Sequence, residues 1–159
     1  MEDAFIIEKS MRYDIKGRKY IGTLSKYYFQ DVGLHNALLN FRQVEETHIM
    51  ENVIYNELRS RGYSVDVGIV EARTAMERKL LEVDFVANKG DKRYYIQSAF
   101  ALPDEEKRQQ EMASLKRIDD SFKKIIIVRE DIAPYYNEYG ILIIGLMDFL
   151  LGINVEEVL

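Results

Sequence analysis

The chain has 159 residues, of which 47% are hydrophobic, enough for one globular domain with a buried core. Its 22 basic and 27 acidic residues give a net charge of −5, which argues against a general nucleic-acid footprint but leaves room for a local basic groove. The absence of cysteine excludes disulfides, thiolate chemistry and cysteine-type zinc sites, and it favours an intracellular, cytoplasmic protein. No apolar run approaches the roughly 20 residues of a membrane span, so we expect no membrane partner.

The N-terminal segment, residues 4–23, is predicted to form a β-hairpin that turns at Asp14-Ile15-Lys16-Gly17. Because this hairpin has no evident core of its own, we interpret residues 1–25 as the tail of a preceding module. Residues 26–159 then form the main domain. It opens with a short strand, Lys26-Tyr27-Tyr28-Phe29, and a helix that Asp31 caps.

A second helix is predicted over residues 45–61, ending at Gly62, with apolar residues at helical spacing on one face: Met50, Val53, Ile54 and Leu58. Glu51 lies at the edge of this apolar face. Alternating apolar residues predict a strand over 65–69, and residues 71–79 are expected to form a charged connector.

Two further strands, over residues 82–87 and 94–99, are predicted to be joined by a turn at 88–91. On the first, strict alternation would turn Glu82 and Asp84 to one face and Val83 and Phe85 to the other. On the second, Gln97 and Ala99 would share a face. An acidic residue followed thirteen positions later by a polar one is the layout of metal-dependent nuclease cores.

The C-terminal third begins with a helix after Pro103, with acids in its first turn and Met112 and Leu115 as core anchors. The unbroken apolar run at 125–128 predicts a strand covered on both faces. A loop over 134–140, a strand over 141–144 and a short helix over 146–151 complete the chain. This order predicts an α/β sandwich with a mixed β-sheet flanked by helices.

Six ordered segments make the chain resemble the C-terminal domain of unknown function of prokaryotic AAA-type ATPases, a member of the PD-(D/E)XK, or restriction-endonuclease-like, superfamily. A weaker echo of that domain's closing pattern lies around Gly140-Ile141 and 148–150. The six segments are residues 12–17, 26–34, 51–58, 61–65, 82–86 and 95–97, namely RYDIKG, KYYFQDVGL, ENVIYNEL, RGYSV, EVDFV and YIQ.

The resemblance implies that a winged-helix and ATPase region precedes this domain, with residues 1–25 as its remnant. The chain itself has no G-x-x-x-x-G-K-[ST] segment and therefore no ATP site of that kind. We expect an AAA-type ATPase domain, in the same or a neighbouring polypeptide, as a partner.

The resemblance also implies a site at which Glu51, Asp84 and Gln97 hold Mg²⁺ or Mn²⁺ for phosphodiester cleavage. Gln97 and Ala99 depart from this pattern, since active nucleases carry an acid and a lysine at these two positions. We expect no other ammonium group nearby, although Arg78 or Lys79 could supply a relocated one. In a purely structural reading, Asp84 binds backbone groups and Glu51 pairs with a basic residue.

The leading functional expectation is therefore a non-catalytic, nuclease-like domain that binds or regulates nucleic acid or protein. One alternative is a Mg²⁺-dependent DNA nuclease with a rearranged active site. Another is a structural homodimerisation domain that pairs through its N-terminal hairpin. The pairs Lys107-Arg108 and Lys116-Arg117, expected on one helix, could contact phosphate or form a solvated face.

Overall fold

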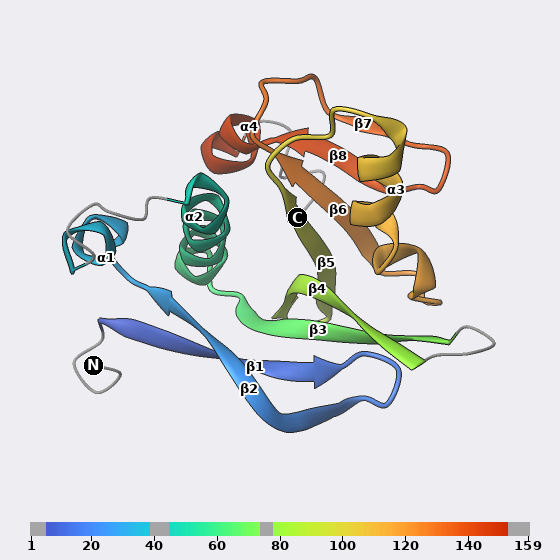
Figure 1. Cartoon of the computed structure of the whole chain (residues 1–159), viewed down its shortest axis with the longest axis horizontal. Helices are drawn as coiled ribbons and strands as arrows, with labels where there is room; N and C mark the ends of the chain where they lie inside the picture. The colour runs from blue at the N-terminus through green and yellow to red at the C-terminus, as the bar shows by residue number, and fades with distance from the viewer. Residues whose placement is uncertain (1–5, 39–44, 74–77, 153–159) are drawn as a thin grey trace.

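A computed structural model describes residues 6–38, 45–73 and 78–152. Its described strands form one mixed sheet in the order β2-β1-β3-β4-β5-β6-β8-β7, flanked by helices, which confirms the predicted α/β class (Figure 1). The strands are β1 (Ile7–Asp14), β2 (Lys19–Phe29), β3 (Ser64–Arg73), β4 (Arg78–Lys89), β5 (Lys92–Ala99), β6 (Lys123–Val128), β7 (Tyr135–Tyr136) and β8 (Leu142–Gly145). The helices are α1 (Val32–Leu38), α2 (Glu46–Ser60), α3 (Glu105–Met112), the 3₁₀ turn η1 (Leu115–Arg117) and α4 (Leu146–Leu151).

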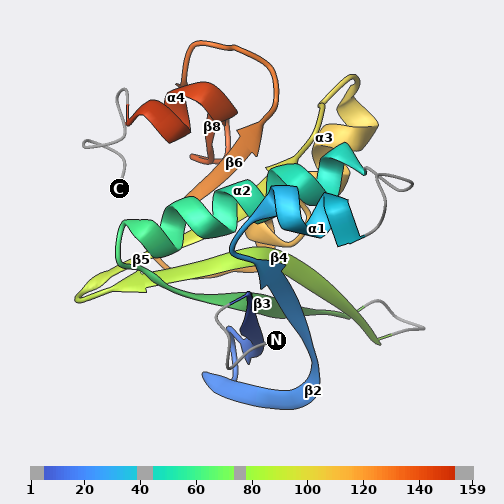
Figure 2. The same ribbon diagram turned by 90° about the vertical axis from the view of Figure 1, so that its left-hand side faces the viewer.

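The sheet separates two hydrophobic clusters. Helices α2 and α4 cover one face, where Ile54, Leu58 and Phe149 are buried in the first cluster (Figure 2). Helix α3 and η1 cover the other face, where Met112 and Leu115 anchor the second cluster, as predicted. Strand β6 contributes to both clusters, so the prediction of a strand covered on both faces is confirmed.

The N-terminal hairpin is part of this sheet. Strand β1 pairs antiparallel with β2 and parallel with β3, while β2 lies at the edge of the sheet. The segment predicted as a separate short strand, 26–29, is the continuation of β2, so the predicted division at residue 25 falls inside this strand. The hairpin's origin in a preceding module stays a prediction.

Capping residues account for several helix boundaries. The Leu34 backbone N–H donates to Asp31 Oδ1 at 3.0 Å before α1, and the Lys107 N–H donates to Asp104 Oδ1 at 2.8 Å in the first turn of α3. Helix α2 ends just before Gly62, whose φ of 84° is the left-handed conformation that favours glycine. On α2 it is Tyr55 that is buried with the predicted apolar positions, while Val53 is only half-buried.

Three predictions about connections need correction. Strand β3 continues to Arg73 and β4 begins at Arg78, so most of the expected charged connector over 71–79 is sheet, and residues 74–77 lie outside the described part. The expected loop over 134–140 contains the short strand β7. Helix α3 ends at Met112, so Lys116 and Arg117 lie on η1 and not on the helix that carries Lys107 and Arg108.

A bulge interrupts the pairing of β3 with β4. The partners shift between Asp66, opposite Val86, and Gly68, opposite Val83, so β4 carries one extra residue there. Val83 consequently lies in the second cluster while Phe85 lies in the first, which contradicts the prediction that they share a face. Gly68 fits this crowded point because a Cβ there would lie 2.8 Å from side-chain atoms of Ile15 and Val86.

Candidate functional site

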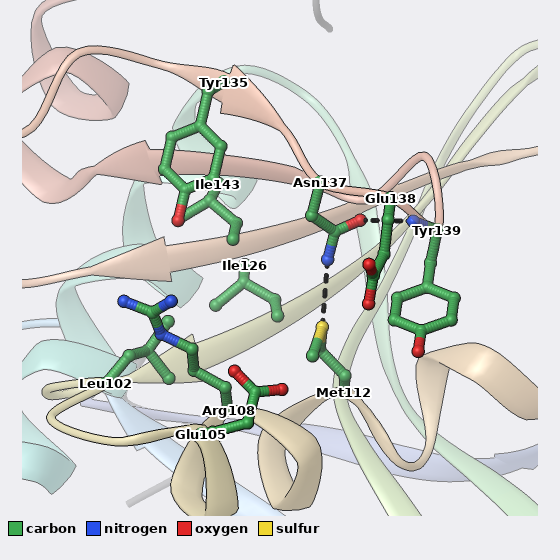
Figure 3. Close-up of a pocket in the computed structure, with 10 residues that line it drawn as sticks. All are labelled: Leu102, Glu105, Arg108, Met112, Ile126, Tyr135, Asn137, Glu138, Tyr139 and Ile143. Atoms are coloured by element: carbon green, nitrogen blue, oxygen red, sulfur yellow. Dashed lines mark hydrogen bonds between the residues drawn. The ribbon is translucent and has the colours of Figure 1, made fainter.

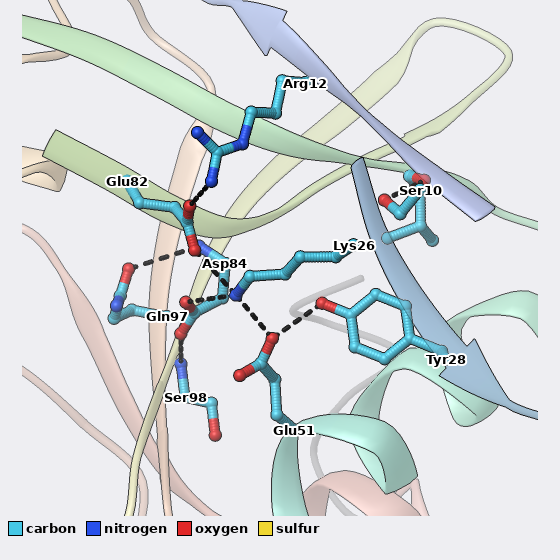
Figure 4. Close-up of polar contacts among 10 residues, drawn as sticks. Ser10, Arg12, Lys26, Tyr28, Glu51, Glu82, Asp84, Gln97 and Ser98 are labelled. Atoms are coloured by element: carbon cyan, nitrogen blue, oxygen red, sulfur yellow. Dashed lines mark hydrogen bonds and ion pairs between the residues drawn. The ribbon is translucent and has the colours of Figure 1, made fainter. Parts of the chain in front are cut away.

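Lys26 on edge strand β2 reaches three carboxylates from two other elements (Figure 4). Its Nζ lies 2.7 Å from Glu51 Oε1 on α2, 2.7 Å from Glu82 Oε1 on β4 and 3.7 Å from Asp84 Oδ1 on β4. We call Lys26, Tyr28, Glu51, Glu82 and Asp84 the Lys26 cluster. The cluster joins the hairpin, helix α2 and the central strand β4.

Hydrogen bonds fix the acids of this cluster. The Tyr28 hydroxyl donates to Glu51 Oε1 at 2.7 Å, and the Ser98 backbone N–H of β5 donates to Asp84 Oδ2 at 2.8 Å. Glu82 also accepts from Arg12 Nη2 of β1 at 3.1 Å. Because Lys26 and Tyr28 are two residues apart on one strand, both side chains project toward α2.

Burial makes these contacts electrostatically strong. The side chains of Asp84 and Glu51 are only 12% and 16% exposed, and that of Lys26 is 27% exposed. Charges in such surroundings interact more strongly than in water and cost more when they are left unpaired.

The pKa values respond to this environment. Burial, followed by the nearby charge of Glu51, raises the pKa of Asp84 to about 7, against the opposing effects of Lys26 and the Ser98 N–H. Burial alone would lower the pKa of the Lys26 ammonium, but Glu51 and Asp84 outweigh it and the pKa is raised. Burial and Glu51 also raise the pKa of the Tyr28 hydroxyl. Asp84 can therefore exchange a proton near neutral pH.

The structure brings the three predicted ligands to one region. The Asp84 backbone N–H faces Gln97 Oε1 at 3.4 Å, and Glu51 meets Asp84 through their shared contact with Lys26. Ala99 is 1% exposed and packs in the second hydrophobic cluster.

The expectation that no ammonium group lies nearby is wrong, because Lys26 supplies one from a strand that the site prediction did not include. Lys79, the predicted alternative, is exposed at the start of β4. The sequence did hold one signal for Lys26, since it shares a strand face with Tyr28, which is 4% exposed.

The chemistry of the donors fits a hard cation such as Mg²⁺, which prefers carboxylate and amide oxygens. Glu51, Asp84 and Gln97 offer these atoms. Two buried atoms close by, Arg12 Nε and Ser98 Oγ, lack a hydrogen-bond partner among the described residues. Within the same residues no group of three or more His, Cys, Asp or Glu is arranged as a ready metal site, and the Lys26 ammonium takes the central position. A cation would therefore bind only together with displacement of Lys26 from at least one acid.

A cleft of about 310 Å³ reaches this cluster beside α2, with Lys26, Tyr28 and Glu51 in its wall. Another cavity of about 220 Å³ lies on the opposite face of the sheet, between α3 and β7 (Figure 3). There Asn137 Nδ2 donates to Met112 Sδ, and Arg108 and Tyr135 line the rim. The second cavity shares no residue with the Lys26 cluster.

Comparison with known proteins gives a relative but no function. An uncharacterized protein of Haemophilus influenzae is 35% identical over 154 residues, an alignment that covers 95% of this chain and 35% of that protein. The chain thus spans about a third of the length of that relative. No family model matches the chain, and no solved structure matches it significantly. In the described part of the chain, no helix has the length and apolar character needed to cross a membrane.

Proposed function

We propose that this chain is a restriction-endonuclease-like domain in which the Lys26 cluster binds a divalent cation and cleaves a phosphodiester of DNA. The observation that carries the proposal is the Lys26 ammonium, 2.7 Å from Glu51 and 3.7 Å from Asp84, because it replaces the cationic group missing at Ala99. This favours the rearranged nuclease over the non-catalytic domain expected from the sequence.

The order of the elements supports the proposal. Helix α2, strands β3, β4 and β5, helix α3 and strand β6 follow the order helix, three strands, helix, strand. Within this unit β3–β4 and β4–β5 are antiparallel and β5–β6 is parallel. Glu51, Asp84 and Gln97 lie on α2, β4 and β5, as the resemblance implies.

Each side chain has a role in this proposal. Glu51, Asp84 and the Gln97 amide oxygen would hold the cation, which would polarise the phosphate and lower the pKa of a water molecule. Asp84 gives up its proton on binding, since metal ligands must be deprotonated. Lys26, released from the acids, stabilises the negative charge that develops on the phosphate oxygens.

We further propose that an AAA-type ATPase domain is the partner of this domain and that both act in the cytoplasm. The support is the length of the Haemophilus influenzae relative, of which about two thirds lies outside the aligned segment. This partner is tested by purifying the ATPase from the protein's own cell. The chain should co-purify with the ATPase, and it should no longer do so when the ATPase domain is deleted.

The test of the nuclease is cleavage of plasmid and single-stranded DNA by the purified chain in Mg²⁺ or Mn²⁺. We expect Asp84→Asn and Lys26→Met each to lower the rate by about 10²–10³. The matched control is Glu106→Gln, the same carboxylate-to-amide change at an exposed acid of α3, which should leave the rate unchanged. Cleavage that survives Asp84→Asn would come from a contaminant and contradict the proposal.

A second candidate, the non-catalytic binding or regulatory domain, has one observation in its favour. Lys26 neutralises the acids and stands where a cation would, with no ready metal site in the described residues. Unchanged melting temperature in millimolar Mg²⁺ or Mn²⁺, together with absent cleavage, would favour this candidate, because a ligand that binds the folded state must raise its stability.

One observation favours homodimerisation through the hairpin. Strand β2 lies at the edge of the sheet and pairs only with β1 among the described strands, so its other side can pair with a strand of a second chain. Light scattering that gives the mass of one chain across a concentration series would exclude this role.

A further inference from the structure

A basic groove lies where three connections meet, on a side of the molecule that shares no residue with the Lys26 cluster. The β1–β2 turn, the β4–β5 turn and the segment before β6 form two adjoining cavities of about 320 Å³ and 310 Å³. Both cavities are lined by Arg18, Arg93 and Phe122. We call these residues, with Lys16, Lys92, Arg117 and Tyr13, the basic groove.

The groove is lined by more basic than acidic residues, whereas the chain as a whole is negatively charged. Lysines and arginines line it at five positions, whereas the whole chain carries −5. Its acids are Asp91, Asp119 and Asp120, and Asp120 already accepts hydrogen bonds from the Tyr95 hydroxyl at 2.6 Å and the Phe122 N–H at 3.2 Å.

The arginines of the groove have no close carboxylate partner among the described residues, although Arg93 acts electrostatically on Asp66. In the described part of the chain no carboxylate lies within 4.0 Å of the charged groups of Arg18, Arg93 or Arg117, although such pairs hold Arg12, Arg59 and Arg61. Unpaired guanidinium groups that share a cavity are suited to a phosphate, which can accept hydrogen bonds from several of them at once.

Aromatic rings stand beside these charges. The Arg93 guanidinium lies 5.5 Å from the ring centroids of both Tyr13 and Phe122, and its Nε donates to Asn88 Oδ1 at 2.6 Å. Phe122 remains 39% exposed. An exposed aromatic ring next to cationic groups is the combination with which proteins hold single-stranded nucleic acid, stacking a base and pairing its phosphate.

Arg18 occupies its place at a conformational cost. Its φ of 50° is in the left-handed region, which glycine adopts freely and arginine does not. A glycine there would satisfy the turn better, so removal of Arg18 can be tested without damage to the backbone.

We propose that the basic groove binds one phosphate of a single-stranded nucleic acid and stacks the adjoining unpaired base on Phe122. This inference rests on the proposed function for the identity of the ligand as a nucleic acid. It does not require cleavage or a metal ion.

The experiment measures fluorescence anisotropy of a labelled oligothymidylate with the full chain in EDTA, which removes any nuclease activity. For Arg18→Gly combined with Arg117→Ala we expect at least about tenfold weaker binding. The slope of log affinity against log salt should be shallower by about 0.7, the contribution of one phosphate contact on a single strand. Phe122→Leu should weaken binding about tenfold without changing the salt slope.

The matched control is Arg129→Ala, an exposed arginine that follows the opposite end of β6 and should bind like the unaltered chain. Circular dichroism is the check that each variant is folded. Absent binding, equal loss in the control, or a duplex that binds as tightly as the single strand would overturn the inference. Cleavage that fails while this binding persists would count against the proposed nuclease only.

Discussion

The Lys26 cluster and the basic groove hold charge in opposite ways. In the cluster, one ammonium is shared by three carboxylates, and the side chain of Asp84 is only 12% exposed. In the groove, arginines stand without carboxylate partners among the described residues and around a half-exposed Phe122. Partnered, buried charges contribute to stability and shift pKa values, whereas unpartnered, exposed charges are free to bind. Mutations should therefore act on stability in the cluster and on binding in the groove.

The largest effect is expected for Lys26→Met, which leaves Glu51, Glu82 and Asp84 without their shared cation. Removal of one partner from a buried pair costs about 3 to 5 kcal/mol of unfolding free energy. Urea unfolding at pH 8 measures this loss, which should shrink at acidic pH as the carboxylates become protonated. Lys9→Met, the same change at an exposed position of β1, is the control and should cost less than about 0.5 kcal/mol.

Asp84→Asn should give a pH-dependent effect. Because the folded-state pKa of Asp84 is raised to about 7, its protonated form contributes stability that is fully present below its ordinary pKa and is lost as the pH rises through 7. Asparagine cannot ionise, so the unfolding free energy of the variant relative to that of the unaltered chain should rise by roughly 3 to 4 kcal/mol between pH 4 and pH 8. Unfolding free energies measured across this interval test the sign, and a gain that is flat with pH would contradict it.

Tyr28→Phe should have a moderate effect. It removes the hydroxyl that donates to Glu51 but keeps the ring stacked on Tyr55, with centroids 4.0 Å apart. We expect a loss of about 1.5 to 3 kcal/mol of unfolding free energy at neutral pH, the range for a hydrogen bond to a charged group. The neighbouring Tyr27→Phe is the control because Tyr27 is 52% exposed. Equal thermal shifts in the two variants would show that the Glu51 contact contributes nothing.

The smallest effect on stability is expected for Arg18→Gly in the groove. Relief of the positive φ offsets the greater freedom of glycine in the unfolded chain, so the unfolding free energy should change by less than about 0.5 kcal/mol. Calorimetry measures it. A loss of unfolding free energy as large as that of Tyr28→Phe would mean that Arg18 stabilises the fold. The groove would then resemble the Lys26 cluster and not differ from it.

The same contrast explains what the sequence could predict. Elements with strong local signals were predicted, including the Asp31 cap, most of the apolar face of α2 and the doubly buried β6. The convergence of Glu51, Asp84 and Gln97 was implied by the resemblance to restriction-endonuclease-like domains and not by local sequence signals, and the three residues lie on α2, β4 and β5.

Features set by tertiary pairing were missed. Lys26 comes 58 positions before Asp84 in the chain, and only the β1–β3 pairing brings its hairpin beside β4. The bulge that separates the faces of Val83 and Phe85 depends on register with β3, which alternation within one strand does not encode. The basic groove combines three connections, and no single one of them carries enough charge to be noticed.

Because Lys26 lies on β2, the N-terminal hairpin supplies the positive charge of the Lys26 cluster. An edge strand opens more readily than the interior of a sheet, because it is held on one side alone. If β2 separates from β1, the Lys26 ammonium moves away from the cluster. Glu51, Glu82 and Asp84 then lose the cation that they share. A ligand that binds along that edge would therefore change the net charge of the Lys26 cluster, which lies against a central strand of the sheet.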